Sequence, residues 1–315
     1  MKTILVPLGG AALAEQALPY AQMLAPLLQA NIHLLRAISE PERAALLAGD
    51  LSQQQALAAP PVECAQCSLT TLCEHTNCYI AEQTLRLRAA DIDCDADVRV
   101  GTPAAIIAEL AQDLPETLIV MATHGKRGLR RWVQGSVADK IVHDTSAPLL
   151  LVQQGNSRAS AAPKLKRILV PLDRSALAQQ ALPLAIELAA LAQAELILLW
   201  VVAASIEEYL RAFPAESDAQ CALHDQTAEA LANFATLLST RTVEMTTAVG
   251  IGKPAQAIAE EADLRRVDLI VMASHGYTGL ERWRLGSVAD EVLHATTVPL
   301  LLVRSQTAHS ELRSV

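Results

Sequence analysis

The sequence contains the same series of short segments twice, in the same order, and this duplication limits the chain to folds built from two like domains. The repeated segments are Ile-Leu-Val-Pro-Leu at 4–8 and 168–172, Val-Met-Ala-(Thr/Ser)-His-Gly at 120–125 and 271–276, Gly-Ser-Val-Ala-Asp at 135–139 and 286–290, and Pro-Leu-Leu-Leu-Val at 148–152 and 299–303. A length of 315 residues also suits two domains better than one.

The spacing of the copies sets the domain boundaries. Ile4 recurs as Ile168, but the later pairs of segments lie closer together, as His124 and His275 do, so the first repeat holds an additional stretch in its middle. The segment 153–166 between the repeats is rich in Ser, Ala, Gln and Gly, which is typical of a linker. We therefore predict domains at 1–155 and 164–304, the first with a Cys-rich insertion at about 60–80.

Apolar runs alternate with Ala- and Leu-rich helical stretches in each repeat. Strands are expected at 3–8, 32–38, 96–100, 117–122 and 149–152, and again at 167–172, 196–202, 244–249, 268–273 and 300–303; long helices are expected at 11–29, 74–90, 175–193 and 220–238. Strands that alternate with helices indicate an α/β fold with a parallel, doubly wound sheet in each repeat. Ligands of such sheets bind beyond the carboxyl ends of the strands, where the strand order reverses.

Charge and hydropathy exclude several classes of partner. The net charge is −9, so the basic footprint of a nucleic-acid-binding protein is missing. No apolar run is long enough to span a membrane, and the N-terminal segment lacks the apolar core and cleavage site of a signal peptide. We expect a cytoplasmic protein with neither nucleic acid nor membrane as its partner.

The loop after the fourth strand of each repeat has the residues of an anion site. It runs from His124-Gly125 over nine residues to Gly135-Ser136, and the second repeat has the same spacing from His275. Glycine lets the backbone approach an anion closely, and the free amides of the helix that follows favour phosphate. The alternative is turn chemistry alone, because Ser-x-x-Asp at 136–139 and 287–290 resembles a capping box.

These motifs together resemble the universal stress protein family. The resemblance rests on two motifs. The first strand ends in Ile-Leu-Val-Pro-x-Asp, and the loop after the fourth strand consists of a small residue, any two residues, Gly, any nine residues and Gly-Ser. The resemblance occurs in both repeats, and together the two matches cover nearly the whole chain. It implies two tandem Rossmann-like (adenine nucleotide alpha hydrolase-like) domains, each with a five-stranded parallel sheet of order 3-2-1-4-5 flanked by helices. It also implies ATP or AMP binding, a role in stress adaptation, and pairing of the two repeats within the chain as a pseudo-dimer.

The resemblance assigns nucleotide-binding positions in both repeats. Asp173 would contact ribose or adenine, and the backbone at Val201 would contact adenine. The other implied positions are Pro171, Met272, Ala273, Gly276, Gly286, Ser287 and Val288 in the second repeat, and Pro7, Met121, Gly125, Gly135, Ser136 and Val137 in the first. Some of these positions would hold the phosphates. They are Gly276, Gly286, Ser287 and Val288 in the second repeat, and Gly125, Gly135, Ser136 and Val137 in the first.

The sequence departs from the family pattern in two ways. Alanine replaces the first glycine of the loop, as Ala122 in one repeat and Ala273 in the other. The aspartate after the first strand is present as Asp173 but is replaced by Gly9 in the first repeat. We therefore expect the second repeat to be the better nucleotide site.

A cysteine cluster lies in or beside the extra segment of the first repeat. Its members are Cys64, Cys67, Cys73 and Cys78, with His75 between the last two. Soft ligands at such short spacing predict a Zn²⁺ site, and the alternative is a set of free or redox-active thiols.

Three functions follow from the sequence. The first is a non-enzymatic regulator that binds ATP or AMP and changes its contacts with a regulatory protein partner, with homodimerisation as a further expectation. The second is a slow ATPase or another enzyme of the same broad α/β class. The third is a zinc or thiol redox sensor that uses the Cys64–Cys78 cluster, with degenerate nucleotide sites.

Overall fold

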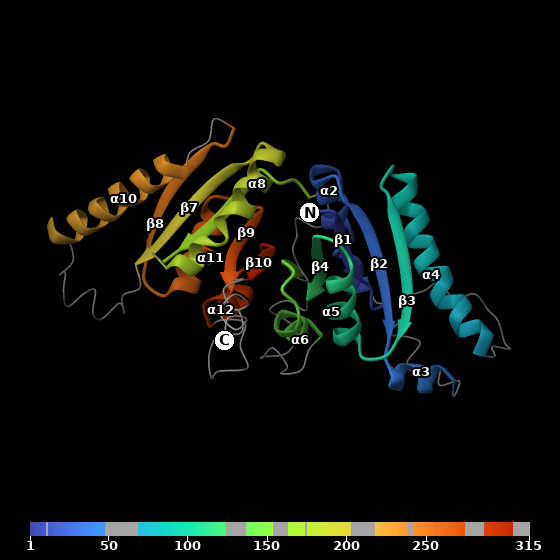
Figure 1. The fold of residues 1–315 in the computed structure, drawn as a ribbon. Coiled ribbons are helices and arrows are strands. Elements are labelled where there is room, and N and C mark those ends of the chain that lie inside the picture. Colours follow the sequence, from blue (N-terminus) through green and yellow to red (C-terminus); the bar gives the residue numbers. More distant parts are fainter. Residues whose placement is uncertain are drawn as a thin grey trace, which may run out of the picture. The chain divides into compact units, whose positions relative to one another are not determined.

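The computed structural model divides the chain into two compact units, Met1–Pro163 and Lys164–Val315 (Figure 1). The structure describes residues 1–10, 12–47, 69–123, 137–153, 163–173, 175–202, 218–238, 242–274 and 287–304. Each unit alternates strands with helices, as the sequence predicts for an α/β fold.

The first unit is a parallel sheet flanked by helices. Its elements are β1 (Thr3–Pro7), α1 (Ala12–Glu15), α2 (Leu18–Leu28), β2 (Asn31–Ile38), α3 (Glu40–Leu47), α4 (Leu69–Ala89), β3 (Cys94–Val100), α5 (Pro103–Asp113), β4 (Thr117–Thr123), α6 (Val137–Asp144) and β5 (Leu149–Gln153). The strand order is β3-β2-β1-β4-β5, and every neighbouring pair is parallel. This is the order that the family resemblance implies.

The second unit repeats this plan. Its elements are β6 (Arg167–Leu172), α7 (Ala176–Gln179), α8 (Leu182–Ala192), β7 (Glu195–Val202), α10 (Asp218–Leu238), β8 (Met245–Ile251), α11 (Pro254–Leu264), β9 (Leu269–Ser274), α12 (Ser287–Ala295) and β10 (Leu300–Arg304). Within this unit the order is β8-β7-β6-β9-β10, again with parallel neighbours.

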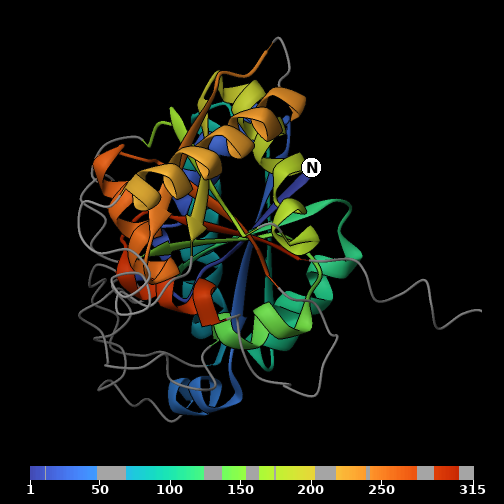
Figure 2. The same cartoon turned by 90° about the vertical axis from the view of Figure 1, so that its left-hand side faces the viewer.

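Apolar burial on both sheet faces explains the continuous apolar strands. Ile4, Leu5 and Val6 of β1 have no exposed surface, and Ile168, Leu169 and Val170 of β6 have none either. Helices cover both faces of each sheet (Figures 1 and 2). In the second unit α10 and α11 both contact β7 and β8. A parallel sheet buried in this way needs β-branched and leucine side chains at nearly every position.

The helices depart from the sequence prediction in two places. Each long helix expected after the first strand is divided into a short helix and a longer one, α1 and α2 or α7 and α8, with proline in the first turn of the longer helix. Proline lacks the backbone N–H that would continue the preceding turn and suits the start of a helix. The structure also contains α3, which the sequence did not predict. In the described residues, no helix is both long and apolar enough to cross a membrane.

Candidate functional site

The central strands separate at their carboxyl ends. In the first unit β1 pairs with β4 at Thr3, Ile4 and Leu5, although β1 continues to Pro7 and β4 to Thr123. The amide of Leu8 donates to β2, at 2.8 Å from Leu35 O. Amides along a strand alternate in direction, so the position of Pro7 is the one whose amide would face β4, and proline has no amide hydrogen to donate. The repeated proline thus ends the ladder between the central strands.

The same separation occurs in the second unit. There β6 and β9 pair at Ile168–Leu269 and Leu169–Ile270, and Pro171 follows in β6. The chain leaves β6 toward β7 and leaves β9 toward β10, in opposite directions from the centre of the sheet. Right-handed crossovers then place the following helices on opposite faces, which makes this edge the switch point where ligands of such sheets bind.

Several predicted site residues of the second unit share one sheet face at this edge. A Cβ atom added to Gly250 would meet Ala257 of α11 at 3.2 Å and Val201 at 3.8 Å, so Gly250 and Val201 face α11. Strand register places Pro171 and Met272 on the same face. Val201 and Met272 are each 8% exposed. The structure therefore brings these three positions together as an apolar floor at the carboxyl ends of β6, β7 and β9.

Asp173 lies directly after β6 and is exposed. Its Oδ1 atom accepts a hydrogen bond from the amide of Ser175 at 3.0 Å. The hydroxyl of Ser175 in turn accepts from the amide of Ala178 at 3.0 Å and caps α7. These bonds fix the carboxylate at the rim of the edge and engage one of its two oxygens, so Asp173 has both a turn-forming role and an acceptor to offer a ligand.

The first unit has no carboxylate at this position. Gly9 takes the place of Asp173, and Gly10 follows with a φ of +76°. Its other described site positions, Pro7, Met121 and Val137, lie at the ends of β1 and β4 and at the start of α6. The two edges therefore differ in the group that would contact ribose or adenine.

The phosphate loops can be followed only at their ends. Ala273 lies in β9, Ser287 begins α12 and is exposed, and Val288 follows it half-buried. The loop positions Gly125, Gly135, Ser136, Gly276 and Gly286 lie outside the described residues.

The structure shows two hydroxyl groups that the sequence analysis did not select. Thr123 ends β4 and Ser274 ends β9, and they are 7% and 3% exposed. In the described part of the chain neither hydroxyl oxygen has a hydrogen-bond partner. The available signal was the repeat itself, because the two matched segments differ here only by exchanging one hydroxyl residue for another.

The cysteine cluster is placed only in part. Cys64 and Cys67 lie outside the described residues, as do the side chains of Cys73 and His75. Cys78 is an exposed free thiol on α4. Among the described side chains no group of three or more His, Cys, Asp or Glu could hold a metal ion. The metal or redox site at 64–78 stays a prediction.

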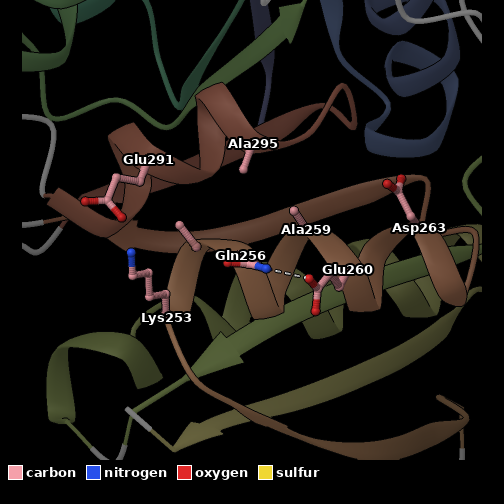
Figure 3. A pocket seen from close by; sticks show the side chains of 8 residues that line it. Lys253, Gln256, Ala259, Glu260, Asp263, Glu291 and Ala295 are labelled. Atoms are coloured by element: carbon pink, nitrogen blue, oxygen red, sulfur yellow. Dashed lines mark hydrogen bonds between the residues drawn. The ribbon is translucent and has the colours of Figure 1, made fainter. Parts of the chain in front are cut away.

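A pocket of about 370 Å³ lies between α11 and α12 in the second unit (Figure 3). Its lining includes Lys253, Gln256, Ala259, Glu260, Asp263 and Glu291. Gln256 donates to Glu260 across one turn of α11 at 2.8 Å. With three carboxylates against one lysine, this groove would repel a phosphate group. We therefore place the candidate site at the strand ends.

The chain is similar to known proteins in both of its repeats. The sequence model of the universal stress protein family matches residues 1–153 and 164–304. A universal stress protein of Methanocaldococcus jannaschii is 34% identical over 142 residues, which are 44% of this chain and 82% of that protein. A universal stress protein of Mycobacterium tuberculosis is 27% identical over 207 residues, 65% of this chain and 66% of that protein.

A solved structure shares the fold along almost the whole chain. A universal stress protein from Archaeoglobus fulgidus aligns with a TM-score of 0.70 at 19% identity, covering 96% of this chain and 98% of that one. At this level of identity the likeness concerns the fold, including the presence of two repeats.

Proposed function

The chain belongs to the universal stress protein family, and from that premise we propose that it is a stress-response protein that binds ATP or AMP in its second repeat. The observation that carries the proposal is the edge formed by β6, β7 and β9. It combines an apolar floor at Pro171, Val201 and Met272 with the carboxylate of Asp173 at its rim.

These residues suit the parts of an adenine nucleotide. Val201 and Met272 offer a buried apolar surface for the face of a purine. The carboxylate of Asp173 accepts hydrogen bonds from ribose hydroxyls or from the adenine amino group. The start of α12 at Ser287, with Val288 behind it, supplies free amides and the positive end of the helix dipole for phosphate.

We propose binding and regulation as the function, with hydrolysis slow at most. The described groups at the edge are an aspartate engaged in a turn, hydroxyls and apolar side chains. This set offers recognition of base, sugar and phosphate. A regulatory protein that distinguishes the nucleotide-bound form from the free form would complete the function.

We also propose that the two repeats pair within one chain as a pseudo-dimer. The family likeness and the presence of two repeats support it, and so does the connection, which has about a dozen residues from Gln153 to Arg167. Such a segment reaches no more than about 45 Å even when fully extended. Small-angle X-ray scattering of the monomeric chain tests this, because separated units would give a clearly larger radius of gyration.

The decisive experiment on the function is titration of the full chain with ATP, AMP and adenosine in a calorimeter, paired with native mass spectrometry. We expect one site of higher affinity per chain, occupied by ATP or AMP. Failure of the chain to bind any of the three at millimolar concentration would refute the proposal. A steady release of phosphate from ATP at catalytic rates would instead favour the ATPase alternative.

A further inference from the structure

The hydroxyl groups of Thr123 and Ser274 occupy matched positions in the two repeats, at the ends of β4 and β9. Both side chains are more than nine-tenths buried, and in the part of the chain that the structure describes neither hydroxyl has a hydrogen-bond partner. A buried hydroxyl without a partner lowers stability, and native proteins rarely keep one without a use for it. This chain keeps the feature in both repeats.

A second pair of buried hydroxyls shows the structural use of the same residue type. Thr145 and Thr296 also occupy matched positions in the two repeats and are 5% and 1% exposed. Each accepts a hydrogen bond from the amide two residues later, at 3.1 Å from Ala147 and from Val298. These threonines stabilise the turns that lead into β5 and β10, so their hydroxyls are explained by the fold. The hydroxyls of Thr123 and Ser274 are not.

Ser274 lies where the candidate site requires a donor. Strand register puts it on the sheet face of Met272 and pairs it with Arg304 of β10. It is also the last strand residue before the segment that leads to the start of α12. A hydroxyl, an arginine at the neighbouring strand position and a helix that begins after the strand are groups that suit a phosphoryl group.

We propose that the Ser274 hydroxyl donates a hydrogen bond to a phosphoryl oxygen of the nucleotide bound in the second repeat, and that Thr123 is the equivalent donor in the first. The proposal rests on the function proposed above. In this proposal, bound phosphate is the partner of a hydroxyl that has none among the described residues. The first unit pairs Thr123 with Gln153 where the second pairs Ser274 with Arg304, so the described strand ends differ by this one positive charge.

The test compares ATP and adenosine binding to the full chain and its Ser274→Ala variant, with thermal unfolding of both proteins without nucleotide. We expect the affinity for ATP to fall about tenfold, the cost of one hydrogen bond to a charged group. The affinity for adenosine should not change, because adenosine has no phosphoryl group. The unfolding midpoint without nucleotide should stay the same or rise, because the variant removes an unpaired buried hydroxyl.

Two control variants complete the test. Ser274→Thr keeps a hydroxyl, as the first repeat does, and should bind ATP like the natural chain. Thr296→Ala removes a buried hydroxyl that has a partner, so it should lower the midpoint and leave ATP affinity unchanged. Equal ATP affinity of Ser274→Ala, an equal loss for adenosine, or a midpoint lowered as in Thr296→Ala would each overturn the proposal. Absence of ATP binding by the natural chain would instead refute the proposed function itself.

Discussion

The second strand of each unit carries a different large side chain at the same place. Arg36 of β2 and Trp200 of β7 are equivalent positions when β1 is aligned with β6. Arg36 is 5% exposed and forms an ion pair with Glu42 of α3. Trp200 instead lines a pocket of about 220 Å³ with Leu231 and Phe234 of α10. One unit thus buries a charge where the other places a half-buried aromatic ring.

The residues near Arg36 are also more polar than those near Trp200. Glu15 of α1 accepts a hydrogen bond from the hydroxyl of Tyr79 at 3.0 Å, whereas its counterpart Gln179 lies at the wall of the apolar pocket. Burial and the nearby Glu15 carboxylate raise the pKa of Tyr79 well above its ordinary value. The first unit therefore fills this region with hydrogen bonds and ion pairs, and the second with apolar contacts.

The comparison shows that two repeats with the same strand arrangement can pack different kinds of side chain, charged or apolar, against equivalent strands. The central strands agree closely because both sheet faces bury them completely. The helices that cover the second strand, and the residue after the first strand, are free to differ. Because Asp173 is kept in only one repeat, we expect ligand binding to be concentrated in the second unit and buried ionic interactions to matter more in the first.

The largest effect expected is on stability of the first unit. Replacing Glu42 with Gln leaves the buried guanidinium of Arg36 without its carboxylate. Removing one partner of a buried ion pair costs about 3–5 kcal/mol, and the partial exposure of Glu42 points to the lower end of this range. Chemical denaturation of the full chain should show the unfolding of the first unit shifted to lower denaturant concentration.

A matched control lies on the same helix. Glu40 pairs with Arg43, and these side chains are 66% and 48% exposed. Glu40→Gln should therefore change stability by less than about 1 kcal/mol. Equal losses in the two variants would show that the buried ion pair is not what stabilises this region.

The next effect concerns nucleotide affinity in the second unit. Asp173→Asn keeps an acceptor for the Ser175 amide but removes the charge. A hydrogen bond to a charged group contributes about 1.5–3 kcal/mol, so ATP affinity should fall tenfold or more. Calorimetry gives the affinity, and thermal unfolding should show little change because the turn is kept. Two equal sites in the natural chain, or unchanged affinity in Asp173→Asn, would break the proposed asymmetry.

Much of the fold was predictable because buried parallel strands are long apolar runs bounded by turns. The repeat also located Pro7 and Pro171, whose missing amides explain why the central strands separate. The ion pair of Arg36 was not predictable, since nothing in the apolar pattern of 32–38 indicates that Glu42 folds back over it. The same limit applies to Thr123 and Ser274, because whether a hydroxyl has a partner depends on three-dimensional contacts.

A smaller effect is expected on the stability of the first unit at alkaline pH. Burial raises the pKa of Cys94 in β3 from 9.0 to about 11. Between pH 9 and pH 11 the thiol ionises in the unfolded chain before it ionises in the folded one, so stability falls as the pH rises. The loss contributed by this thiol at pH 10 is about 1.4 kcal/mol.

Cys94→Ala should remove this part of the pH dependence, which denaturation curves at pH 8 and pH 10 would measure. The matched control is Cys78→Ala, which removes an exposed thiol on α4. A natural chain as stable at pH 10 as at pH 8 would contradict the expectation, since Tyr79 in the same unit should act in the same direction.

The smallest effect expected is a gain of binding in the first unit. Within the described part of the chain, a Cβ atom added at Gly9 would meet no atom within 4 Å, so these residues leave room for the first atom of an aspartate side chain. Gly10, which has the positive φ, is unchanged by this substitution. The new carboxylate would stand where Asp173 stands in the second unit, but Gln153 would still replace Arg304 at the neighbouring strand end. We therefore expect only part of the second unit's affinity, a gain of about three- to tenfold for ATP, or about 0.7–1.4 kcal/mol.

Calorimetry of Gly9→Asp in the Asp173→Asn background isolates this site from the stronger one. A gain there would show that the missing carboxylate limits the first unit, whereas no gain would place the difference in the phosphoryl contacts instead.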